Sequence, residues 1–569
     1  MPSRRSARAT IAVLAGALLL TAFDLSWYWS HRRGFPLHVD ESGFTAFALE
    51  HTHALRSDGL IGLLRSIEEH SVHAPLVPVL AVPLDLVLGD RIGNGFVVVA
   101  AFYGLLITVT YFLTRQLVGP WLAALSAFVV ATAPDVLTFA RSSFVAIPAA
   151  ALFTAALYCL LRSDGLRRLG WCLAGGAFLG FAALTRTMVL GLALGPLVAV
   201  LIQGVARRGE LRSRLMSFGA AVAAAVAVAA TWYARNVGDA VGYLTGTRFS
   251  GSVTRRPEWH LDGRDIRELV SAVQLPLGLL LTGITIAGVV VALRSHRSRR
   301  SLRDELRHLL GTDAAVLVLV ILEGALALSI ADWSQAQWLP LVPAMIALAV
   351  LALASLARAR IRATLACAVL VLSTFNLVMV SDVWPWLGKP RTVSAGPVGD
   401  LTVTDGRQYV ERFFDGLVDS DRPGRFPDSW RRWLPLHRKL TAWMARYAAA
   451  HGQRPVVVIG GDDSRLLNLN DVLLSDRLND DEQAMIVGRV FIERDTSRRT
   501  IRRDFDDPQF GLPNFVITLD IPRRIEPERR VEGVLRDGGF RVLKTVSLPE
   551  GTGRVWWRSQ ADVPAARAA

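Results

Sequence analysis

Lysine and cysteine are both scarce in this chain of 569 residues. Only three of its 63 basic residues are lysines, and this bias toward arginine indicates a high-G+C genome. The three cysteines all lie inside apolar stretches, at Cys159, Cys172 and Cys367. They therefore read as small core residues, which excludes a disulfide framework or a cysteine-based metal site. Internal repeats and a G-x-G-x-x-G nucleotide-binding turn are also missing from the sequence.

Long apolar blocks dominate the first two thirds of the chain. The protein is 52% hydrophobic with a mean hydropathy of +0.35, and a bilayer core needs roughly 20 apolar residues per helix. Eleven blocks qualify as predicted spans: 10–29, 94–114, 119–134, 146–161, 170–185, 187–204, 215–233, 274–293, 313–331, 337–356 and 363–381. A lesser stretch, 74–88, is broken by three prolines and Asp85, so we expect a helix at the interface, with a twelfth span as the alternative.

The net charge of +14 is distributed over alternate connections between these blocks. Arginines gather before the first block, after 114, around 162–168, around 207–214, around 294–307 and around 358–362. This is the positive-inside pattern, which predicts a cytoplasmic N-terminus and a basic face toward anionic lipids. Nucleic acid is therefore not an expected partner. An odd number of spans places the C-terminal tail outside the cytoplasm.

The blocks divide the chain into a membrane part and a tail. We expect a polytopic helical membrane domain over 1–384, with a first outer loop at 30–93 and a second large outer loop at 234–273. Residues 385–569 are polar, and strand-like runs alternate there with helical patterns near 428–451 and 526–537. Such alternation predicts a small extracytoplasmic α/β domain.

An acidic pair, Asp40-Glu41, follows the first block at the level of the outer membrane surface. A solvated pair in a loop is the ordinary explanation of two such residues. However, the pair stands among apolar and small residues, and an amphipathic stretch from Leu49 to Ile67 follows and could cover it. A carboxylate at this depth could accept a proton from an attacking hydroxyl, and its neighbour could orient it or bind a divalent metal.

Five short motifs lie in a fixed order relative to these spans. They are Asp40-Glu41, then 73–78 (HAPLVP), 133–141 (APDVLTFAR), 180–186 (GFAALTR) and 338–343 (WLPLVP). Their order and placement resemble the GT-C membrane glycosyltransferases, in the branch of the protein O-mannosyltransferases and lipid A aminoarabinose transferases. The resemblance covers roughly residues 10–385.

This resemblance implies an inverting transfer of a hexosyl or pentosyl group from a polyprenyl-phosphate sugar donor to a glycan, lipid or protein acceptor. Asp40 is then the expected base and Glu41 the orienting residue or a ligand to Mg²⁺ or Mn²⁺, and the reverse assignment stays open. The family's second acid, after the arginine of its third span, falls here at Ala146. Asp135 is nearby and is the candidate substitute, while the missing acid keeps a non-catalytic member open.

Basic and polar residues near the outer ends of spans are candidates for the donor site. Guanidinium groups grip phosphates through paired hydrogen bonds, which favours Arg141 and Arg186, or Arg255 and Arg256 of the second outer loop. Snorkelling to the interface is the alternative for the first two. Further candidates for contacting substrate or orienting a carboxylate are His73, Trp333 and Gln337, although tryptophan at this level commonly belongs to the interfacial belt.

Two other classes of protein compete with the transferase. A transporter or flippase of lipid-linked sugars would also be polytopic, although the absence of repeated halves counts against it. A scaffold of envelope assembly, with the tail as a binding module, is the second alternative. The sequence as a whole favours a glycosyltransferase in a bacterial inner membrane, crossing it many times.

Overall fold

We describe the fold from a computed structural model of the chain. The structure describes most of the helical part and a large share of the tail. The described residues are 4–69, 73–207, 209–244, 308–330, 338–384, 386, 389, 391–394, 400–404, 406, 428–460, 467–479, 485–490, 497–505, 513–520, 525–548 and 551–559.

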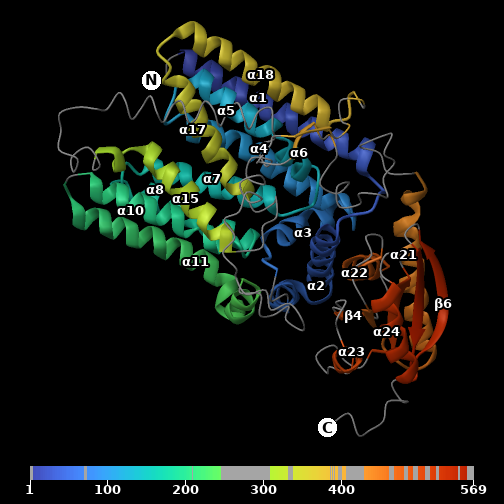
Figure 1. The fold of residues 1–569 in the computed structure, drawn as a ribbon. Helices are drawn as coiled ribbons and strands as arrows, with labels where there is room; N and C mark the ends of the chain where they lie inside the picture. The colour runs from blue at the N-terminus through green and yellow to red at the C-terminus, as the bar shows by residue number, and fades with distance from the viewer. Residues whose placement is uncertain are drawn as a thin grey trace.

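A bundle of helices forms the larger part of the molecule (Figure 1). Its principal helices are α1 Arg4–Trp27, α4 Gly93–Thr114, α5 Pro120–Thr132, α7 Ala146–Arg162, α8 Leu169–Thr185, α9 Val189–Leu192, α10 Leu194–Ala206, α11 Leu211–Leu244, α15 Asp313–Ile330, α17 Val342–Ala354 and α18 Ala359–Val380. The short elements η1 Tyr28–Arg32, α6 Pro134–Ala140 and η2 Leu339–Leu341 extend α1, α5 and α17. Ten of the eleven apolar blocks coincide with these helices, and the block at 274–293 lies outside the described residues.

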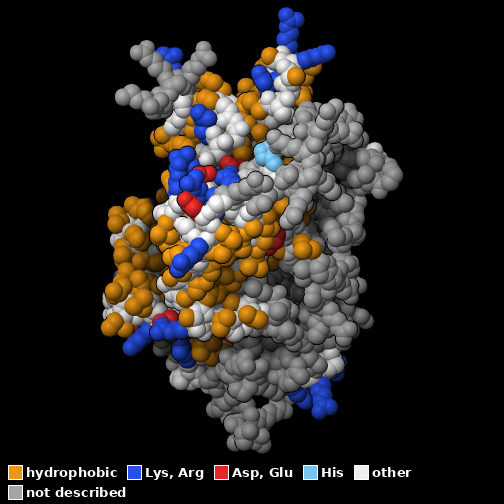
Figure 2. All heavy atoms as spheres, turned by 90° about the vertical axis from the view of Figure 1, so that its left-hand side faces the viewer, with side chains coloured by type: hydrophobic (Ala, Val, Ile, Leu, Met, Phe, Trp, Pro, Cys, Tyr) orange, Lys and Arg blue, Asp and Glu red, His pale blue; other side chains and the backbone are white. Residues whose placement is uncertain are grey.

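Several of these helices are suited to cross a membrane. Among the described residues, five are long and apolar enough, or six if α5 and α6, bent by 62° at Ala133, form one span. Apolar side chains such as Leu18, Leu19, Met216 and Val371 are 66–73% exposed on the outside of the bundle. Figure 2 shows hydrophobic side chains covering much of the described part of one face, with arginines in separate groups. A large exposed apolar surface on a helical bundle faces lipid, so this is a membrane protein.

Two of the arginine-rich connections, 162–168 and 207–214, meet at one end of the bundle. Arg207, after α10, pairs with Asp164 after α7 at 2.6 Å and with Asp313 at the start of α15 at 3.0 Å. Arg214 of α11 donates to the carbonyl of Gly165 at 2.9 Å. Since α7 and α8 each have 17 residues, roughly 25 Å separates this end from the opposite one.

Two helices between α1 and α4 lie toward that opposite end. The first, α2 Val39–Glu69, is bent at Gly59, whose φ of +64° an L residue rarely adopts. The second, α3 Leu76–Leu88, contains Pro83 and is one of the shorter apolar helices, in the place where we expected an interfacial helix. The acidic pair lies in the first turn of α2, so the loop expected there from the sequence is in fact the start of a helix.

The tail forms a separate layered domain beside α2 (Figure 1). Its main sheet has the strand order β4-β3-β5-β7-β6, with β4, β3 and β5 parallel and the last two antiparallel to their neighbours. The strands are β3 Val456–Gly460, β4 Ile486–Val490, β5 Phe515–Asp520, β6 Arg541–Leu548 and β7 Gly551–Trp557, and β1 Arg391–Ser394 pairs separately with β2 Asp400–Thr404. The helices are η4 Asp428–Arg432, α21 Trp433–Ala450, α22 Leu469–Arg477, α23 Arg498–Phe505 and α24 Ile525–Asp537. The predicted small α/β domain is confirmed.

Candidate active site

The first turn of α2 is fixed by a reciprocal cap. The backbone N–H of Asp40 donates to Nδ1 of His38 at 3.1 Å, and the backbone N–H of His38 donates to Oε2 of Glu41 at 2.8 Å. The arrangement resembles a capping box, with histidine in the place that serine or threonine usually takes and its ring accepting from the second helical residue instead of the third. The cap defines where α2 begins and therefore where each carboxylate of the acidic pair points.

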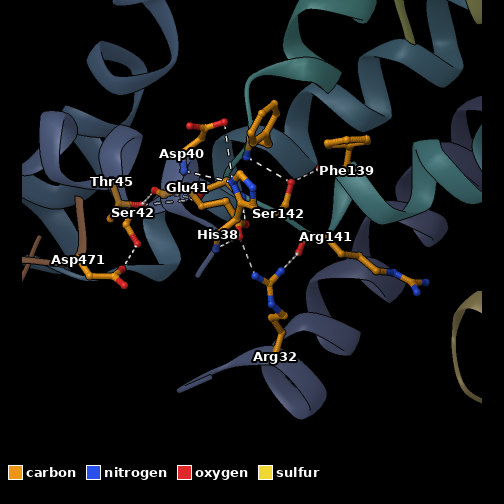
Figure 3. A network of polar contacts seen from close by, with 12 residues as sticks. Arg32, His38, Asp40, Glu41, Ser42, Thr45, Phe139, Arg141, Ser142 and Asp471 are labelled. Carbon is orange, nitrogen blue, oxygen red and sulfur yellow. Dashed lines mark hydrogen bonds and ion pairs between the residues drawn. The ribbon is translucent and has the colours of Figure 1, made fainter. Parts of the chain in front are cut away.

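Glu41 is completely buried, and its carboxylate is held from three sides (Figure 3). Its Oε2 forms a 2.7 Å ion pair with Arg32, which is itself 3% exposed, and its Oε1 accepts the backbone N–H of Ser143 at 3.1 Å. These contacts join the end of α1, the start of α2 and the connection before α7. Glu41 therefore holds three segments together, and it does not face the pocket that contains Asp40.

Asp40 points the other way, into a pocket that is partly open to solvent and has a cavity volume of about 50 Å³. Its side chain is 43% exposed, and its Oδ2 lies 3.8 Å from Nδ1 of His38. The pocket is lined by Asp40, Phe44, His73, Ala74, Phe144, Val145, Thr185, Arg186 and Thr187. The structure thus brings together three of the predicted residues, Asp40, His73 and Arg186, from segments far apart in the sequence.

Arg186 stands at the carboxyl end of α8 and is partly buried. Its guanidinium carbon lies 5.5 Å from the centre of the Phe144 ring, an arrangement that holds the planar group against an apolar surface. In the same lining, the His73 ring lies 5.7 Å from that of Phe44 and 5.4 Å from that of Phe47. The pocket therefore combines one carboxylate, one guanidinium, one imidazole and two aromatic faces.

Arg141 lies elsewhere, in the interior of the bundle. It is 1% exposed, and its guanidinium donates to Oδ1 of Asp24 at 2.9 and 3.0 Å and to the hydroxyl of Ser381 at 2.8 Å. The Trp27 ring covers it at 4.5 Å. Arg141 thus ties α1 to the end of α18, and the structure does not bring it to the pocket of Asp40.

The other predicted site residues fall into two groups. Asp135 lies in the first turn of α6 and is 1% exposed, so it is away from the lining of the Asp40 pocket. The remaining four lie outside the described residues: Arg255, Arg256, Trp333 and Gln337.

A metal ion shared by Asp40 and Glu41 does not fit this geometry, because the oxygens of Glu41 are engaged by Arg32 and by two backbone N–H groups. Within the described part of the chain, no three His, Cys, Asp or Glu side chains are grouped to hold a metal. We therefore assign no chemical step to Mg²⁺ or Mn²⁺ at the acidic pair.

A second, narrow and more apolar pocket, with a cavity volume of about 10 Å³, is lined by Phe44 and lies between α2, α3 and α4. The buried carboxyl group of Asp85 lines it, accepting hydrogen bonds from Nδ2 of Asn94 at 2.6 Å and from the hydroxyl of Thr52 at 3.3 Å. Burial raises the pKa of Asp85 to about 6, although the hydrogen bond from Asn94 acts in the opposite direction.

Sequence reasoning missed the residues that build the site around Asp40. Arg32, the partner of Glu41, was not singled out, nor were His38, Phe144, Thr185 and Thr187. Spacing gave one usable signal: His38 stands three residues before Glu41, as the first residue of a capping box stands before its acid.

Comparison with known proteins places this geometry in a recognised architecture. Residues 72–233 match the family model described as dolichyl-phosphate-mannose-protein mannosyltransferase. ArnT from Cupriavidus metallidurans, solved with bound undecaprenyl phosphate, matches with a TM-score of 0.54 at 15% identity, over 97% of this chain and 99% of that chain. Its apo state matches with a TM-score of 0.54 at 15% identity, over 96% of this chain and 98% of that one. No curated protein sequence matches the chain.

An archaeal oligosaccharyltransferase, AglB from Archaeoglobus fulgidus in complex with an inhibitory peptide and a dolichol-phosphate, also matches. The TM-score is 0.51 at 11% identity, over 98% of this chain and 75% of that chain. The chain has the GT-C fold. The match with ArnT spans nearly the whole of both chains, so the GT-C architecture extends here from the bundle into the tail. At 11–15% identity, the site chemistry must be argued from this chain's own residues.

Proposed function

We propose that the protein is an inverting glycosyltransferase that moves a sugar from a polyprenyl-phosphate donor to a hydroxyl acceptor. The observation that carries the proposal is the pocket in which the half-exposed carboxylate of Asp40 and the guanidinium of Arg186 meet. ArnT and AglB, which share the fold, were solved with undecaprenyl phosphate and dolichol-phosphate respectively. A lipid-phosphate donor therefore agrees with both the fold and the lining of the pocket.

Asp40 is the proposed general base. The acceptor oxygen attacks the anomeric carbon while its proton passes to the Asp40 carboxylate. The bond from that carbon to the phosphate oxygen breaks, and the polyprenyl phosphate leaves with the electron pair. One displacement inverts the anomeric centre. Among the described residues that line the pocket, Asp40 is the one carboxylate, whereas a glycosidase needs two carboxyl groups flanking the bond.

Arg186 is the proposed binder of the donor phosphate. A guanidinium presents a planar fork that matches two phosphate oxygens, and here Phe144 restricts its orientation. Negative charge grows on the phosphate as the bond breaks, so the interaction strengthens toward the transition state. The Phe44 and Phe144 rings and the threonines beside Arg186 provide apolar and hydroxyl surfaces for a hexosyl or pentosyl group.

The pocket is proposed to face the outside of a bacterial cell membrane. The Asp164–Arg207–Asp313 contacts mark the arginine-rich end of the bundle, and the pocket lies at the other ends of α7 and α8. The positive-inside rule assigns the arginine-rich end to the cytoplasm. The N-terminus is then cytoplasmic, the C-terminal domain extracytoplasmic, and the acceptor a glycan, lipid or protein of the envelope.

Turnover by the purified protein in vesicles tests the proposal. Polyprenyl-phosphate sugar is supplied with envelope extract as acceptor, and release of polyprenyl phosphate is measured. We expect turnover in the wild type and a loss of about 10²–10⁴-fold in Asp40→Asn, the range that a general base contributes. Asp58→Asn is the matched control, because Asp58 is an exposed carboxylate on the same helix.

Two other results would contradict the proposal. Transbilayer movement of the donor without sugar transfer would favour a flippase. Donor binding with neither transfer nor movement would favour an envelope scaffold.

A further inference from the structure

The C-terminal domain contacts the turn that carries Asp40. Helix α22 begins at Leu469, and its cap Asn468 accepts the backbone N–H of Asp471 at 3.0 Å. Immediately after this start, Nδ2 of Asn470 donates to the carbonyl of Val39 at 2.7 Å. The hydroxyl of Ser42 donates to Oδ1 of Asp471 at 2.5 Å, and both residues are buried.

These bonds leave the Asp471 carboxylate little freedom. Its Oδ2 accepts from Nδ2 of Asn468 at 2.7 Å, while its Oδ1 holds Ser42. Hydrogen bonds to an ionised acceptor are short and stronger than neutral ones. A Cβ added at Gly43 would lie 2.8 Å from Nδ2 of Asn470, so the Asn470 side chain packs directly against the α2 backbone at Gly43.

The contact is on a different face of α2 from Asp40. At 100° per residue, Val39, Ser42 and Gly43 share one face, and Asp40 projects about 100° away from it. Figure 3 shows the Asp40 carboxylate and the Ser42–Asp471 pair pointing in different directions from the same turn. Hence α22 can fix the backbone of the turn without occupying the pocket.

Packing further along α2 reinforces the contact. Ala46 and Leu49 of α2, with Leu37 just before the helix, form one buried cluster with Trp433 of α21 and Leu474 of α22. Beyond it, Arg477 of α22 pairs with Glu50 at 3.3 Å, and both side chains are less than 20% exposed. The two helices are therefore locked over three turns of α2.

We propose that Asn470 and Asp471 of the C-terminal domain are positioning residues for Asp40. The inference rests on the proposed role of Asp40 as the base. Through Val39 and Ser42, the two residues hold the first turn of α2 at the depth and rotation that the reaction requires. A displacement of about 1 Å of a catalytic group can cost about 10²-fold in rate. The C-terminal domain thus supports the first turn of α2 on the face that is turned away from the pocket.

The first test measures kcat and KM for the donor in full-length Ser42→Ala and Asn470→Ala. We expect kcat to fall about 10- to 100-fold with KM for the donor nearly unchanged, since Arg186 is untouched. Asp471→Asn keeps an oxygen acceptor for Ser42 and should restore most of the rate that Asp471→Ala loses. Asn479→Ala is the matched control, because Asn479 donates to Thr441 within the C-terminal domain.

A double substitution separates positioning from general damage. If Asn470 acts through Asp40, adding Asn470→Ala to Asp40→Asn should cause no further loss of turnover, whereas a general structural defect would lower the residual rate again. An additional loss in the double variant, or an unchanged kcat in Ser42→Ala and Asn470→Ala, would overturn the inference.

A labelling experiment does not depend on activity. Asp40→Cys is placed in a Cys367→Ala background, because Cys159 and Cys172 are buried and Cys367 is exposed. A charged thiol reagent should modify position 40 at a different rate when Asn470→Ala is added, and at the same rate with Asn479→Ala. An unchanged rate contradicts the positioning role. Absence of turnover in the wild type contradicts the proposed function instead, and the labelling result still reports on the turn.

Discussion

Replacing each of the two adjacent carboxylates of α2 by its amide should affect stability at Glu41 and turnover at Asp40. In Glu41→Gln, the amide replaces a carboxylate that meets Arg32 at 2.7 Å and accepts two backbone N–H groups. The variant leaves the buried Arg32 charge without its partner, and breaking such a pair costs about 3–5 kcal/mol of stability. The Gln amide also directs N–H groups toward donors that previously met an acceptor.

In Asp40→Asn, the change falls on a side chain that is 43% exposed and whose Oδ2 lies 3.8 Å from Nδ1 of His38. Such substitutions usually change stability by less than about 0.5 kcal/mol. The expected loss is instead in turnover, by about 10²–10⁴-fold. Stability and chemistry are therefore predicted to separate between residues 40 and 41.

The assay combines thermal unfolding of the purified variants with turnover measured well below both unfolding midpoints. Glu41→Gln should unfold several degrees below the wild type and retain more turnover than Asp40→Asn. Asp40→Asn should unfold with the wild type. If Glu41→Gln kept the wild-type midpoint and lost turnover as Asp40→Asn is expected to, the base would have to be Glu41, and the reasoning from burial would be refuted.

Three further outcomes are expected. Arg186→Lys keeps the charge but loses the planar fork, so KM for the donor should rise about 10- to 100-fold. Arg33→Lys is the control, because Arg33 is exposed. An unchanged KM would show that Arg186 does not bind the donor phosphate. EDTA should leave turnover unchanged, because the oxygens of Glu41 are engaged by Arg32 and backbone N–H groups, and a loss restored by Mg²⁺ would contradict this prediction. The pKa of Asp85 is about 6 in the folded state, which is above its unfolded value. Between about pH 4 and 6 the folded state therefore binds more protons than the unfolded state, and the wild type loses stability as the pH rises through this range. Asp85→Asn lacks this dependence, so its unfolding midpoint relative to the wild type should rise between pH 4.5 and 7, and parallel midpoints would refute the assignment.

The apolar pattern predicted the helices well because lipid imposes a strong and local requirement. Ten apolar blocks lie on described helices, and the tail strands β3 to β7 fall on the strand-like runs of the tail. The apolar pattern also indicated that Arg186 lies near Asp40, because each residue follows an apolar run that ends at the same end of the bundle. These features depend on short stretches of sequence, which a single chain reveals.

The different surroundings of Asp40 and Glu41 could not be predicted from short stretches of sequence. It depends on Arg32 at the end of α1 and on the backbone of Ser143, which only the tertiary fold brings to Glu41. Arg141 illustrates the same limit, because Asp24, 117 residues earlier in the chain, takes its guanidinium. A buried charge selects its partner by position in space, and one sequence does not record that position.

The Ser42–Asp471 contact has a consequence for how the protein is made. Its two ends are 429 residues apart in the chain. At a synthesis rate of about 5–20 residues per second, about 20–90 s pass between the emergence of the first and of the second. During that interval the bundle can insert, while the helix that bears Asp40 still has no support behind it. The nascent chain thus completes the proposed active centre only after α22 has emerged.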